Sequence, residues 1–189
     1  MANAGIVRSE AWALLNEHVK NPNMIKHCLA SEAVMRAAAK RLGQDEEVWG
    51  LAGLLHDLDV EITGADLTVH GLKAAEMLAA RGVAPEIVDA VRMHNEKAHG
   101  QKRSTVFHKA LAAAETITGL ITATTLVYPD KKLASVKPSS VVKRMKEKAF
   151  AASVDREIIR ECEPAGIPLP EFAQLAVDAM RAIAPDLGL

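Results

Sequence analysis

The stretch LAGLLHD, residues 51–57, places an imidazole and a carboxylate at the end of an apolar helical run. Polar groups are costly in an apolar interior unless they are paired, so His56 and Asp57 need a partner there. Neutral imidazole and carboxylate are the ligands that divalent Mn, Fe, Co or Zn prefer in a site of nitrogen and oxygen donors. The pair therefore indicates a metal site, provided that the chain supplies further ligands.

The run belongs to a helix that Asp45 can cap and whose apolar positions cover most of its surface. That pattern is typical of a helix at the centre of a bundle. Aromatic residues make up only 3% of the chain, and we find no alternating β-branched run between turn signals. We therefore expect an all-α bundle of roughly eight or nine helices without a sheet. The other predicted helices lie near residues 9–20, 24–42, 66–80, 85–97, 104–126, 138–148, 154–163 and 170–183.

Composition narrows the class of protein. The 189 residues suffice for one globular domain with a substantial core, and we expect a single domain over residues 1–189. A formal net charge of -1 gives no general attraction to nucleic acid or membranes, so we expect neither as a partner.

Targeting signals and cysteines indicate the compartment. Residues 1–5 lack a basic leader, and the apolar stretch 110–128 is interrupted by Glu115, so we expect neither secretion nor a membrane span. Cys28 and Cys162 lack the CxxC spacing of metal or redox motifs and are typical of reduced thiols. We therefore expect a cytoplasmic location.

Four of the seven histidines are embedded in apolar helical patterns. Besides His56, His27 lies in the first turn of a predicted helix, His70 begins one apolar face and His94 ends another. Helices of a bundle can bring such side chains to one centre. Glu115 is a lone carboxylate among small apolar residues, where burial without a cation is costly. We interpret these residues as candidate ligands.

Each candidate also has a structural interpretation. A single histidine on an apolar helix face is more often a hydrogen-bonded core residue than a ligand, and Glu115 could cap a helix or pair with a nearby cation. The metal hypothesis depends on the ordered set, because coincidence must otherwise explain all of its members together. The remaining histidines lack this support. We interpret His18 and His108 as exposed on helix faces and leave His99 unassigned.

These motifs resemble the HD superfamily of metal-dependent phosphohydrolases, whose signature is His, then His-Asp, then a distant Asp on an all-helical bundle. More narrowly, LLHDLDVE at residues 54–61, HG at 70–71 and MHNE at 93–96 resemble the small stand-alone hydrolases of the HDIG type. The resemblance continues through residues 111–121 and 129–132 towards the C-terminus, so it covers nearly the whole chain.

The resemblance implies one or two divalent metal ions, for which Fe, Mn, Co, Zn and Ni are candidates. It implies that one ion is held by His27, His56, Asp57 and the distant acid, and a second by His70 and His94 with Asp57 as the bridge. It also implies a metal-binding core at about residues 24–128, with C-terminal helices at residues 138–184 packed on it.

One position departs from the family pattern. The family has Asp in a segment resembling AAD-x-x-x-GLI, whereas residues 113–121 read AAETITGLI, with Glu115 at the acid position. Glu is longer by one methylene, so its oxygen is displaced and it could bind through both oxygens or through water. We expect this change to alter the choice of metal or to weaken the site.

An intact site implies metal-assisted hydrolysis of a phosphoester. Two cations bridged by Asp57 would polarise a phosphoryl oxygen and lower the pKa of a bound water. Asp59 and Glu96 each lie close to a proposed ligand in the sequence. They are candidates for orienting the imidazoles and accepting a proton, although both could equally be surface charges.

A local basic run lies between residues 131 and 148, where one acid stands among seven basic residues. Such runs are usually solvated helix faces, but recognition of a phosphate requires only two or three correctly placed cations. The candidate phosphate-binding residues are Lys148 in this run, Arg156 on the next helix, and Lys73 nearer the proposed metals.

The leading hypothesis is a phosphoric ester hydrolase, a phosphohydrolase or phosphodiesterase acting on a nucleotide or other small phosphorylated metabolite through metal-activated water. The first alternative is a metal-bound but non-catalytic ligand-binding or regulatory domain, which the glutamate at position 115 favours. The second is a metal-free helical interaction module in which the histidines only pack. The sequence leaves the substrate, the metal, the number of ions and the oligomeric state open.

Overall fold

The computed structural model describes residues 4–189, and this part of the chain is helical throughout, without a strand. The predicted all-α bundle is confirmed. Residues 4–189 form ten α-helices, and the one beyond the nine predicted is α10, which has only four residues. The helices are α1 (Arg8–His18), α2 (Pro22–Leu42), α3 (Glu46–Leu55), α4 (Leu72–Ala80), α5 (Pro85–Met93), α6 (Val106–Leu126), α7 (Pro138–Arg144), α8 (Arg156–Arg160), α9 (Leu169–Ala182) and α10 (Ala184–Leu187). Two short 3-10 helices lie at Glu96–Ala98 and Leu133–Ser135.

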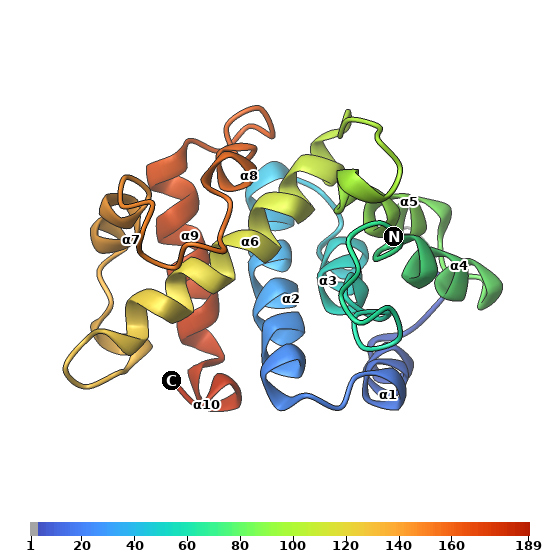
Figure 1. Cartoon of the computed structure of the whole chain (residues 1–189), viewed down its shortest axis with the longest axis horizontal. Coiled ribbons are helices and arrows are strands. Elements are labelled where there is room, and N and C mark those ends of the chain that lie inside the picture. Colours follow the sequence, from blue (N-terminus) through green and yellow to red (C-terminus); the bar gives the residue numbers. More distant parts are fainter. Residues whose placement is uncertain (1–3) are drawn as a thin grey trace.

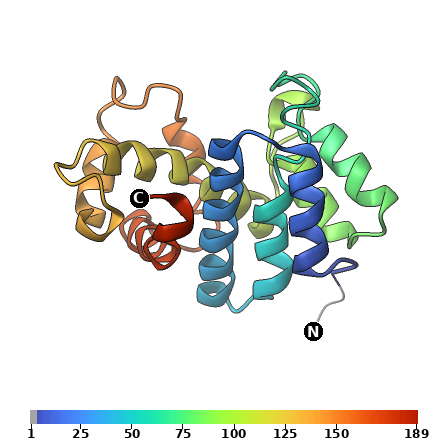
Figure 2. The same cartoon turned by 90° about the horizontal axis from the view of Figure 1, so that it is seen from below.

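Helix α2 lies at the centre of the bundle (Figures 1 and 2). It packs against α3, α6 and α9. In Figure 1, α1, α3, α4 and α5 lie on one side of α2, whereas α7, α9 and α10 lie on the other. Helix α6 crosses the bundle and contacts helices of both groups, α5 on one side and α7 and α9 on the other. Among the described residues, no helix has the length and apolar composition needed to cross a bilayer.

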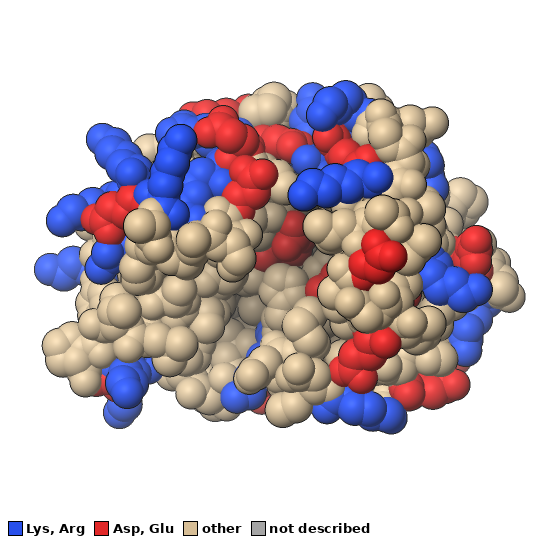
Figure 3. Space-filling view, in the orientation of Figure 1, with Lys and Arg blue, Asp and Glu red and all other residues tan. Residues whose placement is uncertain are grey.

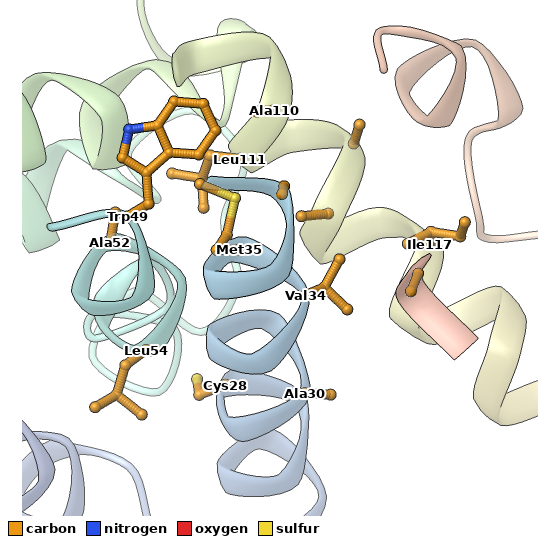
Figure 4. Close-up of a cluster of buried hydrophobic side chains, with 14 of the residues drawn as sticks. Cys28, Ala30, Val34, Met35, Trp49, Ala52, Leu54, Ala110, Leu111 and Ile117 are labelled. Atoms are coloured by element: carbon orange, nitrogen blue, oxygen red, sulfur yellow. The ribbon is translucent and has the colours of Figure 1, made fainter. Parts of the chain in front are cut away.

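The sequence of α3 explains why its end lies in the interior. Asp45 caps the helix by accepting from two backbone amides, and every residue from Val48 to Leu55 is buried. A Cβ on Gly53 would lie 2.6 Å from the carbonyl oxygen of Ser31, so this glycine permits an unusually close approach to α2. Apolar side chains of α2, α3 and α6 fill the space between these helices (Figure 4).

The helix expected over residues 66–80 begins only at Leu72, because residues 56–71 form a series of turns. Gly71 precedes the helix with a φ of +87°, a conformation that glycine adopts without strain. Its amide donates to the carboxylate of Asp59 instead of to a helical carbonyl. A long-range polar contact therefore replaces the first turns that periodicity predicts.

The helix expected over residues 85–97 ends at Met93. Asn95 has extended backbone and its side chain caps the short 3-10 helix that follows. The same side chain donates to the carbonyl oxygen of His70 at 2.9 Å. This contact ties the end of α5 to the turns after α3 and brings His94 towards them.

Candidate metal centre

Five side chains that the sequence singles out meet where helices begin or end. His27 projects from α2, His56 closes α3, and Asp57 begins the turns that follow. His70 precedes α4, and His94 follows the last residue of α5. His27 is half-buried and the other four are buried. The prediction that these helices converge on one centre agrees with this arrangement.

Asp57 lies between two pairs of imidazoles. The Nε2 atoms of His27 and His56 are 3.1 Å apart, and those of His70 and His94 are also 3.1 Å apart. Asp57 Oδ1 lies 3.0 Å from Nε2 of His70 and 3.4 Å from that of His56. Its Oδ2 lies 3.5 Å from Nε2 of His27. Each pair with Asp57 forms a group whose ligand atoms lie within 4.8 Å of one another, and the carboxylate is common to both groups.

Hydrogen bonds on the far side of each ring establish which nitrogen carries the proton. Nδ1 of His56 and of His94 each face the carbonyl oxygen three residues earlier, at 2.9 and 2.6 Å. Nδ1 of His70 faces Oδ1 of Asp59 at 2.7 Å. Carbonyl and carboxylate oxygens only accept, so Nδ1 is the donor in each of these rings.

In His27, too, Nδ1 carries the proton, and its acceptor is the hydroxyl of Thr118 on α6. The Thr118 hydroxyl donates to the carbonyl oxygen of Glu115 at 2.7 Å, and it therefore accepts from Nδ1 of His27 at 3.0 Å. In the neutral rings all four Nε2 atoms then direct lone pairs at the centre. Two such lone pairs 3.1 Å apart beside a carboxylate repel one another unless a cation lies among them. The donor set therefore fits a divalent cation in each group.

Burial and charge separate the pKa values of these residues. Burial lowers the pKa of His56 to about 4 and that of His94 to about 3, so both rings are neutral near pH 7. Burial also disfavours charge on His70, but its hydrogen bonds with Asp57 and Asp59 outweigh burial and raise its pKa to about 10. Burial opposes the charge on Asp57, but the imidazoles around it, His56 first, lower its pKa. A metal and a proton therefore compete for Nε2 of His70.

Asp59 is fully buried and is not a surface charge. Its carboxylate accepts three hydrogen bonds, from Nδ1 of His70 and from the amides of Gly71 and Ala74, at 2.7, 2.9 and 3.0 Å. The backbone bonds hold the carboxylate, and the carboxylate holds the imidazole. This placement accords with an orienting role, and burial keeps Asp59 away from any substrate.

Arg103 is a further partner of the centre that the sequence does not reveal as one. Its buried guanidinium donates to the carbonyl oxygen of His94 at 2.8 Å and pairs with Glu161 at 2.6 Å. The side chain thereby joins the end of α5 to the residue that follows α8. Nothing in the local sequence distinguishes this arginine from an exposed one, because its partners are far apart in the chain.

Glu115 lies at the edge of the centre. Its Oε2 is 3.9 Å from Nε2 of His27, and its other oxygen accepts from the hydroxyl of Thr116. Glu115 belongs to neither of the two groups within residues 4–189. Burial raises the pKa of this carboxyl to about 8, and the nearby charge of Asp57 acts in the same direction. The group is therefore largely protonated near pH 7 unless a cation approaches it.

Glu96, the other predicted acid, does not face the two groups. It pairs with Lys102 at 2.8 Å and accepts from the backbone amide of Arg103 at 2.7 Å. It lines a cavity of about 410 Å³, and it is not among the residues that line a second, neighbouring cavity together with Asp57 and His70. The structure therefore does not bring Glu96 to the proposed metals.

The three predicted phosphate-binding residues also lie outside the cavity above the centre. Lys73 is exposed and pairs with Glu76, and Lys148 is exposed. Arg156 is buried, and its guanidinium donates to four backbone carbonyl oxygens between residues 147 and 154. Its donors hold a turn of the chain instead of facing solvent.

A cavity of about 450 Å³ lies above the two groups, and Figure 3 shows a hollow with acidic side chains on this face. Lys97 is the one Lys or Arg that lines it in the described part of the chain. Asn95, Thr116 and Ser153 contribute other polar groups to its wall. Because Lys97 follows the end of α5 without a helical pattern, only the fold reveals that it lies here.

The prediction that His108 is exposed on a helix face is wrong. The residue is buried, and its Nε2 lies 2.8 Å from Oδ2 of Asp89 on α5. The first turn of α6 packs on α5, so the ring turns towards a carboxylate there. This pair is separate from the two groups around Asp57.

Comparison with known proteins gives one family and two distant relatives. Residues 24–128 match the family described as HD domain. The chain is similar to Ribonuclease Y of Rubrobacter xylanophilus, with 26% identity over 87% of this chain and 32% of the relative. It is also similar to Ribonuclease Y of Opitutus terrae, with 24% identity over 88% of this chain and 32% of the relative. The chain thus spans about a third of the length of these relatives, and no solved structure gives a significant match.

Proposed function

We propose, because the chain belongs to the HD domain family, that it is a metal-dependent hydrolase of phosphoric esters. The observation that carries the proposal is the convergence of four Nε2 atoms on the Asp57 carboxylate. Each ring has its Nδ1 proton held by an acceptor, so Nε2 is the atom that would bind a metal, in His70 after loss of the proton that its raised pKa keeps there near pH 7. We propose a nucleotide or another small phosphorylated metabolite as the substrate.

In this proposal, His27 and His56 together with Asp57 would hold one cation, and His70 and His94 together with Asp57 would hold a second. Divalent cations bound there would supply a polarised phosphoryl oxygen and a water of lowered pKa. Asp59 keeps the His70 ring in the tautomer that presents a lone pair, while Thr118 does the same for His27. Protein groups thus position the donors, and the buried surroundings strengthen their interactions with charge.

Lys97 is proposed to contact the substrate phosphate, since it is the one Lys or Arg among the described residues that line the cavity above the two groups. Lys97→Ala is expected to raise KM about five- to tenfold with little change in kcat, because an exposed ammonium contributes mainly to binding. Steady-state kinetics would measure this. Lys73→Ala removes an exposed lysine outside the cavity and should leave both constants unchanged. Equal effects of the two substitutions would contradict the role of Lys97.

The two Ribonuclease Y relatives support hydrolysis of a phosphoester, because their name denotes cleavage of RNA. RNA is therefore a substrate to include in any assay of this chain. The cavity above the centre has a volume of about 450 Å³ and one Lys or Arg side chain among its described lining residues, which favours a small substrate over a polyanion.

A second candidate function is a non-catalytic, metal-bound regulatory domain. It is favoured by the position of Glu115, whose Oε2 lies 3.9 Å from Nε2 of His27 and outside both ligand groups. Without Glu115, the group of His27, His56 and Asp57 has three protein donors. Such a group still binds a cation, but it holds the ion less tightly than a group with four donors. Turnover separates the two candidates.

The decisive experiment loads the metal-free protein with Mn, Fe, Co, Ni or Zn in separate samples. Metal content is measured after dialysis, and each sample is assayed against nucleotides, cyclic nucleotides, RNA and generic phosphoesters. We expect up to two ions per chain, a raised melting temperature on loading, and turnover with at least one metal. Stoichiometric metal without any turnover would support the regulatory candidate, whereas failure to bind metal would overturn both.

We also propose that the chain forms one domain of the HDIG type, in which helices between residues 138 and 184 pack on a core at about residues 24–128. Contacts of α9 with α2 and of α8 with α6 support this organisation. The free thiols of Cys28 and Cys162 are in keeping with the proposed cytoplasmic location.

A further inference from the structure

A second cavity, of about 520 Å³, lies beside the proposed metal centre between α2, α6 and the C-terminal turn. It shares His27 and Gly119 with the cavity above the two ligand groups. The two cavities therefore meet at a proposed metal ligand and at a residue without a side chain. The residues that line the second cavity include Lys26 and Ala30 from α2, Thr122 and Ala123 from α6, and Leu187.

The walls of the two cavities differ in chemistry. The metal cavity carries the carboxyl groups of Asp57, Glu115 and Asp155. The second cavity has no Asp or Glu side chain among its described lining residues, and small or apolar side chains make up much of its wall. Charged phosphate and its cations therefore fit the first cavity, and an organic group fits the second.

Two polar side chains of the second cavity have no partner of their own. Neither the ammonium of Lys26 nor the hydroxyl of Thr122 has a hydrogen-bond or ion-pair partner within residues 4–189. Both residues are half-buried, and the Lys26 Nζ lies close to Gly188 at the rim of the cavity. These donors can recognise an oxygen acceptor or an acidic group on an otherwise apolar molecule.

We propose that this cavity binds the organic leaving group of the phosphoester that is hydrolysed at the metal centre, a group of up to nucleoside size with an oxygen acceptor facing Lys26. The proposal rests on the proposed function. Hydrolysis joins a water oxygen to phosphorus and breaks the bond from phosphorus to the oxygen of the leaving group, which takes up a proton. The released alcohol or phenol would lie across Gly119 from the phosphate.

Two substitutions test this without touching a proposed metal ligand. Ala123→Phe fills the cavity, and Lys26→Met removes its cation while keeping an unbranched side chain. Ala80→Phe, on the exposed end of α4, is the matched control. The substrates are p-nitrophenyl phosphate, with one ring, and 4-methylumbelliferyl phosphate, with two rings and a carbonyl acceptor.

We expect wild-type KM to be about tenfold lower for the two-ring substrate, because its second ring buries additional apolar area. Ala123→Phe should abolish this preference, because it raises KM for the two-ring substrate much more than KM for p-nitrophenyl phosphate. Lys26→Met should raise KM for the two-ring substrate, which carries the carbonyl acceptor, more than KM for p-nitrophenyl phosphate. Equal kinetics for the two substrates in wild type, or a preference that survives Ala123→Phe, would overturn the proposal.

A binding measurement separates failure of this proposal from failure of the proposed function. Isothermal titration with 2-naphthoate, an aromatic carboxylate without phosphate, should show one site in wild type and in Ala80→Phe. The site should be lost in Ala123→Phe and weakened in Lys26→Met. Such binding in a protein without turnover would support the cavity as a ligand site and reject hydrolysis. Absence of binding to wild type would overturn the cavity assignment whether or not the protein is a hydrolase.

Discussion

Asp57→Asn is expected to lower kcat/KM for the best phosphoester at least about a thousandfold, roughly 4 kcal/mol of transition-state stabilisation, and to release both metal ions. Within residues 4–189, Asp57 is the one carboxylate common to both candidate ligand groups. Asparagine has a similar shape but no charge, and half of its terminal atoms donate instead of accepting. Four imidazoles would then be the main donors for two dications. Metal content after dialysis and steady-state kinetics measure the effect.

Asp66→Asn is the matched control for this substitution. Asp66 lies in the same series of turns, and its carboxylate is exposed and accepts from Thr68. The control should retain metal and activity. Circular dichroism should show the helical content of wild type in both variants. Retention of two ions by Asp57→Asn would contradict the bridging role, and loss of metal in Asp66→Asn would show that the turns respond to any charge change.

Asp59→Asn is expected to remove one metal and leave the other. The Asp59 carboxylate obliges Nδ1 of His70 to carry the proton. The amides of Gly71 and Ala74 require an acceptor at the other oxygen, so the amide nitrogen of asparagine would face the imidazole. His70 would then accept at Nδ1 and protonate Nε2, the atom that faces Asp57. An inverted tautomer cannot bind a metal at Nε2.

The affinity of the group containing His70 and His94 should fall about ten- to a hundredfold, while the group containing His27 and His56 keeps its ion. Metal titration should therefore give one tight site in place of two, and nitrogen-15 NMR of the imidazoles should report the changed tautomer. Asp89→Asn is the matched control, because Asp89 pairs with His108 at 2.8 Å outside the centre. Two unchanged sites in Asp59→Asn would refute the positioning role of this carboxylate.

Much of the candidate centre could be predicted because its candidate ligands lie at or near helix ends. His56 follows an apolar run, and its immersion in the core follows from the burial of that run. His70 and His94 stand beside apolar helix faces for the same reason. The side chain of a polar residue at the end of a buried helix face can point in few directions without entering the apolar core. The histidine side chains therefore converge once the helices pack.

The basic side chain that lines the cavity could not be predicted in this way. Arg156 stands at the start of a short helix, as expected, but its guanidinium turns back to four carbonyl oxygens of the preceding turns. Lys97 lines the cavity although no pattern marks it. The direction of a long, flexible side chain depends on which unpaired carbonyls and carboxylates lie within its reach, and those belong to other segments.

The sequence by itself determined that this chain is an all-α bundle and which donor types it carries into its interior, because apolar periodicity and residue chemistry are local properties. The tertiary structure alone decided the rest. It placed Asp59 against His70 and Thr118 against His27. These contacts determine which nitrogen of these two imidazoles carries the proton and which presents a lone pair to Asp57. It also left Glu115 at the edge of the centre. These outcomes depend on hydrogen bonds between residues far apart in the chain, and such contacts exist only after the helices have packed.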